Sequence, residues 1–138
     1  MILIDSNVII DIVDRDPVWF DWSFENIDRA GQSTVIAITP VVVGEVAARF
    51  TTLDQFRAIM SGLLIQIHDL GAEAAFIAGL AFQAHRQRRK TGDVKSILAD
   101  FLIGGHAQAA GATILTRDPR FYRSYFPGVP LITPSKDD

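Results

Sequence analysis

The first eleven residues place an acidic side chain at the point where a buried strand gives way to a helix. Residues 2–4 are all aliphatic and predict a short buried strand. Asp5 follows directly, and Ser6 and Asn7 suit the start of a helix. In open α/β sheets, ligands bind beyond the carboxyl ends of the strands. Asp5 is therefore a candidate site residue, although helix capping is the plainer role for an isolated aspartate at this position.

The rest of the chain alternates predicted strands with predicted helices. Four further strands are expected, at residues 35–38, 63–67, 112–115 and 129–132. Six helices are expected after the first one, at residues 18–30, 41–50, 52–62, 72–90, 96–110 and 120–126. This alternation predicts an α/β fold, a three-layer α/β/α sandwich around a central, mainly parallel sheet. We expect one domain over residues 1–134 and a frayed tail at 135–138.

Composition and charge exclude several classes of protein. The 138 residues suffice for one domain with a proper core, and 49% hydrophobic with 21% charged residues is typical of a soluble globular protein. Cysteine is absent, which excludes disulfides and cysteine metal sites. No apolar run approaches the roughly 18 residues of a membrane span, and strand sequence begins too early for a leader, so we expect a cytoplasmic protein. The net charge of −3 means that a nucleic-acid site would need a local basic patch or a bound metal.

Three further acids occupy positions that complement Asp5. Asp118 directly follows a predicted strand, so it can reach the same edge of the sheet as Asp5. Glu45 and Asp100 lie in predicted helices amid apolar neighbours, where a buried carboxylate is unfavourable without a partner. Four acids in one cleft would repel each other unless a cation lay between them. Oxygen ligands without cysteine or clustered histidine favour Mg²⁺ or Mn²⁺.

Each of these acids also has a plainer interpretation. Glu45 could form a helical ion pair with Arg49, four residues later. Asp118 could cap the helix that begins after Pro119, and Asp100 could face solvent. The remaining acids of interest are expected to be solvated: Asp11, Asp14, Asp16, Asp21 and Asp93. The histidines are scattered and are expected to be surface or core residues rather than ligands: His68, His85 and His106.

The acids lie in four short segments with recognisable neighbours. The segments are Ile4-Asp5-Ser6-Asn7, Thr39-Pro40 with Glu45, Leu98-Ala99-Asp100-Phe101-Leu102-Ile103 with His106-Ala107, and Ile114-Leu115-Thr116-Arg117-Asp118 with Phe121. In this order, and with residues 130–134 as a last strand, they resemble the PIN-domain nucleases. Within that family they resemble the small VapC-type toxins of prokaryotic toxin–antitoxin pairs. The resemblance covers essentially the whole chain.

This resemblance implies a Mg²⁺-dependent ribonuclease that hydrolyses RNA phosphodiester bonds and has an antitoxin protein as its partner. It implies that the four acids hold Mg²⁺ or Mn²⁺: Asp5, Glu45, Asp100 and Asp118. It also implies that three polar residues orient ligands or substrate: Ser6, Asn7 and Thr116. Many relatives have threonine at Ser6, and either hydroxyl could serve. Relatives often have alanine at Gly104 and Gly105, so we expect these glycines to loosen the helix that carries Asp100, by about 1 kcal/mol each.

Local arginines are the candidates for binding RNA phosphate in this acidic protein. One group begins beside Asp118 and consists of Arg117, Arg120 and Arg123. The other lies at the end of the long predicted helix and includes Arg88 and Arg89. We favour the first group because it adjoins an expected metal ligand, and arginine can grip phosphate oxygens with two parallel hydrogen bonds.

The aromatic segment 19–24 is larger than one short helix needs for its core. We expect part of it to form a homodimer or antitoxin surface. Two alternative functions stay open: a non-catalytic PIN-like module that binds RNA or protein, and a haloacid-dehalogenase-like phosphatase. The phosphatase would need a second acid two residues after Asp5, where this chain has Asn7.

Overall fold

The computed structural model describes residues 1–88 and 94–134, without the side chains of residues 88 and 94–97. In these residues, five parallel strands form a central sheet. The strands are β1 (Ile2–Ile4), β2 (Ile36–Ile38), β3 (Ile65–Ile67), β4 (Thr113–Leu115) and β5 (Leu131–Ile132). Their order across the sheet is β3-β2-β1-β4-β5, and every neighbouring pair is parallel. The predicted parallel sheet is confirmed.

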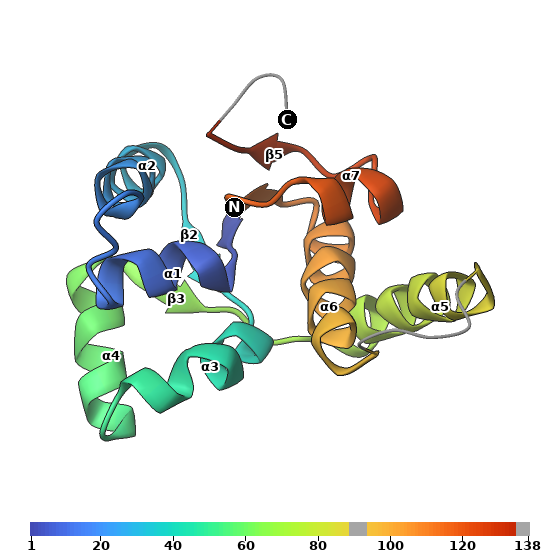
Figure 1. The fold of residues 1–138 in the computed structure, drawn as a ribbon, viewed down its shortest axis with the longest axis horizontal. Helices are drawn as coiled ribbons and strands as arrows, with labels where there is room; N and C mark the ends of the chain where they lie inside the picture. Colours follow the sequence, from blue (N-terminus) through green and yellow to red (C-terminus); the bar gives the residue numbers. More distant parts are fainter. Residues whose placement is uncertain (89–93, 135–138) are drawn as a thin grey trace.

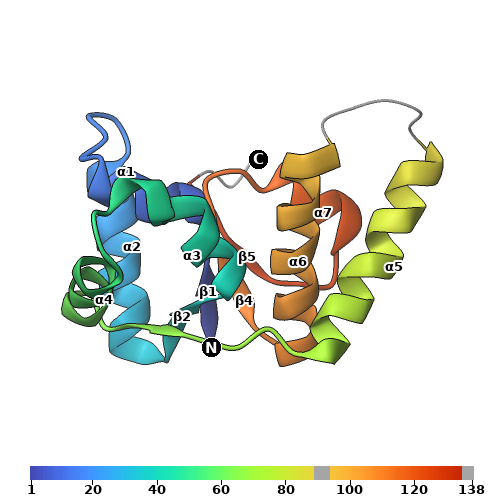
Figure 2. The same cartoon turned by 90° about the horizontal axis from the view of Figure 1, so that it is seen from below.

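The helices are arranged on both faces of this sheet. They are α1 (Ser6–Val13), α2 (Phe20–Ser33), α3 (Pro40–Val46), the short 3₁₀ helix η1 (Ala47–Arg49), α4 (Leu53–Gly62), α5 (Ala72–Arg88), α6 (Val94–Ala110) and α7 (Arg120–Tyr125). Figures 1 and 2 show α1, α2 and α4 on one side of the strands and α5, α6 and α7 on the other. The three-layer α/β/α class is therefore confirmed. No helix among residues 1–88 and 94–134 is long and apolar enough to cross a membrane.

Strands β1, β2 and β4 are short and mostly aliphatic because the helices cover both of their faces. Leu3, Ile4, Ile38, Ile114 and Leu115 are all essentially inaccessible to solvent. A strand that is buried on both faces reads as a continuous apolar run rather than as an alternating pattern. This is why three-residue aliphatic segments were sufficient to locate the sheet.

Several helix boundaries differ from the prediction for local reasons. Helix α2 begins at Phe20, because the main-chain N–H groups of Val18 and Trp19 both donate to Oδ1 of Asp16, each at 2.8 Å. The predicted helix 41–50 is divided into α3 and η1. The end of the predicted helix 72–90 and the tail 135–138 fall outside the described residues.

Gly104 and Gly105 allow α6 to pack closely against its neighbours. A Cβ on Gly104 would lie 2.3 Å from ring atoms of Phe126, and one on Gly105 would lie 2.6 Å from the carbonyl oxygen of Ala74 in α5. Both glycines are buried within a straight run of helix. The two glycines therefore permit close contacts that a side chain would prevent, while the expectation that they loosen this helix stays a prediction.

The strand order creates a crevice at one edge of the sheet. From β1 the chain moves outward through β2 to β3, and it later returns to the other side of β1 as β4 and β5. The order of the strands thus reverses between β1 and β4, and ligands bind at the carboxyl ends of strands at such a point. Asp5 follows β1 and Thr116 follows β4, so both lie at this crevice.

Candidate metal and nucleic-acid site

Asp5 is buried and receives three hydrogen bonds. Its Oδ1 accepts the main-chain N–H of Ser6 at 2.8 Å, so the predicted helix-capping role is real. Its Oδ2 accepts the hydroxyls of Thr116 at 2.8 Å and Tyr122 at 3.0 Å. Burial raises the pKa of Asp5 more than these bonds lower it, and the negative charge of Asp118 raises it further. A buried carboxylate in this state would be stabilised by a nearby cation.

Thr116 connects the carboxyl ends of β1 and β4. While its hydroxyl donates to Asp5, the same oxygen accepts the main-chain N–H of Asp118 at 3.0 Å and the side-chain amide of Asn7 at 3.3 Å. Thr116 is fully buried. The structure therefore brings together three of the predicted site residues around this oxygen, while their roles toward a ligand stay predictions.

The acids on helices, Glu45 and Asp100, have pKa values that are raised in part by the acids at the strand ends. Partial burial raises the pKa of Asp100 to about 7, together with the negative charges of Asp5, Glu45 and Asp118. Partial burial and then Asp5 raise the pKa of Glu45, against a hydrogen bond from Ser6 that lowers it. The four predicted acids, from four separate segments of the chain, thus lie close enough to influence one another's charge.

The chemistry of these donors fits a hard divalent cation. Among the described residues, no three Asp, Glu or His side chains lie close enough together to hold a metal ion as they stand. The four acids offer only oxygen atoms, which Mg²⁺ and Mn²⁺ prefer, and their mutual repulsion would fall when a cation bound. Mg²⁺ or Mn²⁺ held by these carboxylates therefore stays a prediction that the donor set supports.

A family model describes almost the whole of this chain. The model of the PIN domain matches residues 2–127. The chain belongs to the PIN domain family. The haloacid-dehalogenase-like alternative loses its basis, because the PIN match includes all four segments that carry the acids. A comparison with curated protein sequences found no match.

Several solved structures share the fold of this chain. VapBC2 from Rickettsia felis, bound to a DNA fragment from its promoter, is 23% identical with a TM-score of 0.69 and covers 96% of this chain and 98% of its own. FitAcB from Neisseria gonorrhoeae is 18% identical with a TM-score of 0.65 and covers 96% of both chains. A toxin–antitoxin complex from Klebsiella pneumoniae is 21% identical with a TM-score of 0.64 and covers 98% of both chains. At this level of identity, these likenesses establish the fold of the chain.

Asp11 of this PIN domain is buried, so the expectation that it is solvated is wrong. Only 1% of its surface is exposed, and a charge at that depth requires a partner. Arg117 supplies one through two bonds, from Nε to Oδ2 at 2.6 Å and from Nη2 to Oδ1 at 2.9 Å. The guanidinium of Arg117 is therefore engaged with α1, which counts against its expected role as a phosphate ligand.

The other arginine candidates differ in their surroundings. Arg120 and Arg123 are exposed on α7 close to Asp118 in sequence, and they stay candidates for RNA phosphate. Arg89 and the side chain of Arg88 lie outside the described residues, as does Asp93. Asp14 and Asp21 are exposed as expected. Arg49 pairs with Asp14 at 3.1 Å instead of with Glu45.

Two features of the PIN domain were missed in the sequence. Tyr122 was predicted only as part of an aromatic helix, yet its hydroxyl binds Asp5. His68 and His106 are not scattered, because Nδ1 of His68 lies 2.7 Å from Nε2 of His106. Burial and the neighbouring His68 lower the pKa of His106. The sequence offered one signal for Tyr122. It lies four residues after Asp118, in the first turn of the predicted helix 120–126.

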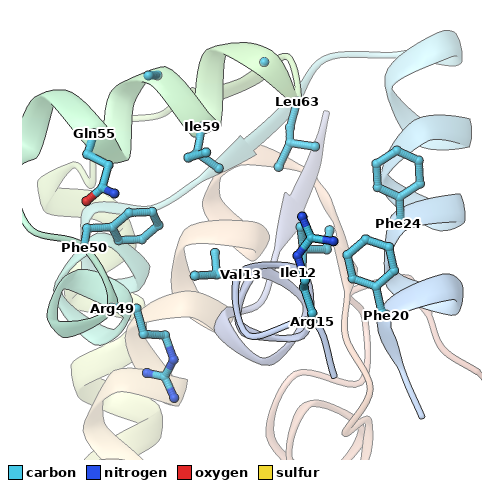
Figure 3. A pocket seen from close by; sticks show the side chains of 12 residues that line it. Ile12, Val13, Arg15, Phe20, Phe24, Arg49, Phe50, Gln55, Ile59 and Leu63 are labelled. Carbon is cyan, nitrogen blue, oxygen red and sulfur yellow. The ribbon is translucent and has the colours of Figure 1, made fainter. Parts of the chain in front are cut away.

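An open pocket of about 540 Å³ lies between α1, α2 and α4, away from the acids. Most of its lining is apolar: Ile12, Val13, Phe20, Phe24, Phe50, Ile59 and Leu63. Figure 3 shows Phe20 and Phe24 on the α2 side and Ile59 on the α4 side. Phe24 remains 43% exposed. Part of the aromatic segment 19–24 thus lines an accessible apolar surface, as the proposed partner surface requires.

Proposed function

We propose that this PIN domain is a Mg²⁺- or Mn²⁺-dependent endoribonuclease and the toxin of a toxin–antitoxin pair. The observation that carries the proposal is the mutual electrostatic influence of Asp5, Glu45, Asp100 and Asp118 at the crevice between β1 and β4. Four acids gathered at the ligand-binding edge of the sheet are unfavourable unless they hold a cation.

The chain's own residues prepare this site in two ways. Tyr122 and Thr116 fix the orientation of the Asp5 carboxylate, and Asp118 is fixed through its main-chain N–H to Thr116. With a pKa of about 7, Asp100 gives up its proton readily near neutral pH when a cation approaches. A bound divalent ion would neutralise phosphate oxygens and lower the pKa of a bound water, which is the chemistry needed for phosphodiester hydrolysis.

A cleavage assay with single-stranded RNA and DNA of the same sequence tests the activity. We expect RNA cleavage that requires Mg²⁺ or Mn²⁺ and is abolished by EDTA. Asp100→Asn should greatly reduce cleavage without unfolding the protein, because it removes one of the repelling charges along with a ligand. Asp21→Asn, an exposed aspartate on α2, is the matched control and should keep full activity.

Three outcomes would contradict the proposal in different ways. Full activity of folded Asp100→Asn would exclude Asp100 from the metal site. Cleavage of DNA alone would change the substrate class. An absence of cleavage with either polymer, despite a folded protein that still binds RNA, would favour the non-catalytic module.

The partner in this proposal is an antitoxin whose apolar segment binds the pocket between α1, α2 and α4. The pocket joins apolar side chains with the guanidinium of Arg15, whereas Arg49 at its edge is paired with Asp14. Such a surface suits a partner helix that carries an acid beside its apolar face. One of the similar solved structures, from Klebsiella pneumoniae, is itself named as a toxin–antitoxin complex. A homodimer is the alternative occupant, and light scattering of the isolated protein distinguishes the two.

A further inference from the structure

Arg117 contacts two residues on one face of α1. Its main-chain N–H donates to Oδ1 of Asn7 at 3.2 Å, and its guanidinium donates to both carboxylate oxygens of Asp11. Asn7 and Asp11 are four residues apart in one helix, so their side chains lie above one another on the same face. Arg117 is therefore held against α1 at two points, one through the main chain and one through the side chain.

The second of these points is rigid. Two parallel bonds between a guanidinium and a carboxylate fix the orientation of both groups. Oδ2 of Asp11 also accepts the hydroxyl of buried Ser23 in α2 at 2.7 Å. The guanidinium carbon of Arg117 lies 5.0 Å from the centroid of the Trp19 ring, within range of a cation–π contact. Residues from α1, α2 and the segment before α2 thus surround this guanidinium.

The residues on either side of Arg117 belong to the candidate metal site. Thr116 precedes it and donates to Asp5, and Asp118 follows it and donates its main-chain N–H to Thr116. A three-residue segment with a fixed centre has little freedom at its two ends. The fixed position of Arg117 therefore restricts the main chain on both sides of it, at Thr116, whose hydroxyl bonds Asp5, and at Asp118.

We propose that Arg117 is a positioning residue whose ion pair with Asp11 holds Thr116 and Asp118 in the geometry that binds the divalent ion. This inference rests on the proposed metal-dependent function. It assigns to Arg117 a role through protein contacts, with no contact to RNA. Groups that orient metal ligands change metal affinity by roughly 10- to 100-fold when they are removed.

The test compares three variants with the wild-type protein: Asp11→Asn, Arg117→Met and the double variant Asp11→Asn/Arg117→Met. The double variant removes one negative and one positive charge, so the net charge near the acids is unchanged. Two quantities are measured for each protein: Mn²⁺ affinity by isothermal titration calorimetry, and the melting temperature in EDTA. Arg49→Met is the matched control, because it breaks the exposed pair of Arg49 with Asp14.

We expect thermal stability and metal affinity to respond differently. Arg117→Met should lower the melting temperature, because it leaves the buried Asp11 charge without its ionic partner. The double variant should recover much of that loss, because neither charge remains. Its Mn²⁺ affinity should nevertheless stay roughly 10- to 100-fold below that of the wild-type protein. Arg49→Met should leave both quantities nearly unchanged.

Two results would overturn the inference, and they are distinguishable. Wild-type Mn²⁺ affinity in a double variant that has recovered its melting temperature would show that the ion pair only stabilises the fold. If the wild-type protein itself binds neither Mn²⁺ nor Mg²⁺ by calorimetry, the proposed function fails and the positioning role fails with it. Because Asp11→Asn keeps the shape of the aspartate, it gives the same comparison if Arg117→Met does not fold.

Discussion

The hydroxyl of Tyr122 lies 3.0 Å from Oδ2 of Asp5, although the two residues are 117 positions apart in the chain. Burial and the nearby acids raise the pKa of Tyr122 well above its ordinary value, so this hydroxyl stays a donor. Thr116 donates to the same carboxylate oxygen. Helix α7 therefore takes part in the candidate site by orienting the Asp5 carboxylate that follows β1.

Removal of this hydroxyl should change the pH dependence of metal binding. In Tyr122→Phe the Asp5 carboxylate loses a hydrogen bond that favours its ionised form, so the pKa of Asp5 rises further. We expect the midpoint of Mn²⁺ binding against pH to move to higher pH. Calorimetry across a pH series measures it, with Tyr125→Phe on the same helix as the control. An identical pH profile in Tyr122→Phe would exclude this role.

Asp100 should make the metal-free protein less stable as pH rises. Its pKa in the folded state is about 7, above the ordinary value of 3.8, so between these values the folded state binds more protons than the unfolded state. The free energy of unfolding therefore falls across this interval as pH increases. Melting temperatures in EDTA should show this fall for the wild-type protein and a shallower one for Asp100→Asn. The exposed Asp69→Asn variant should follow the wild-type curve, and equal slopes for all three proteins would refute the assignment.

Glycine substitutions should separate close packing from helix propensity. Gly104→Ala should destabilise the protein by about 1–3 kcal/mol, because the new Cβ overlaps the buried ring of Phe126. Gly79→Ala in α5 is the control, since a Cβ there meets nothing within 4 Å. It should stabilise the protein by up to about 1 kcal/mol. Chemical denaturation measures both values, and a stabilised Gly104→Ala would show that α6 does not pack as described.

Local patterns were sufficient for the fold and for the positions of the acids. Aliphatic runs located the strands, and an acid after a run, as at Asp5 and Asp118, located the edge of the sheet. Pairings across the chain could not be inferred in this way. Asp11 and Arg117 are separated by 106 positions, and periodicity reports only which face of an element a residue occupies. One local signal was overlooked: Asp11 lies between Ile10 and Ile12 in an apolar helix, a setting that indicates a buried aspartate with a partner.

Arg120 is the better candidate for phosphate binding now that Arg117 is known to be paired. In an Asp100→Asn background, which should not cleave RNA, Arg120→Ala should lower the slope of log affinity against log salt by about 0.7. It should leave the melting temperature nearly unchanged, because Arg120 is exposed. Arg29→Ala on α2 is the control. An unchanged slope for Arg120→Ala with a reduced slope for Arg88→Ala/Arg89→Ala would move the RNA path to the end of α5.

The partner pocket should be separable from the acidic site. Phe24→Glu places a charge in the apolar lining, so it should weaken inhibition by a protein encoded beside this one while leaving RNA cleavage unchanged. Phe76→Glu changes a phenylalanine that is 68% exposed on α5 and serves as the control. Inhibition curves of cleavage measure the effect. Equal inhibition of Phe24→Glu and wild-type protein would place the partner elsewhere.

The position of β1 at the centre of the sheet has a consequence for protein synthesis. The ribosome makes this strand first, yet one of its two neighbours, β4, ends at Leu115. The bond from Thr116 to Asp5 joins residues 111 positions apart, and Tyr122 must follow before Asp5 has all its donors. A nascent chain therefore lacks the assembled hydrogen-bond network around Asp5 until the residues up to Tyr122 have left the ribosome.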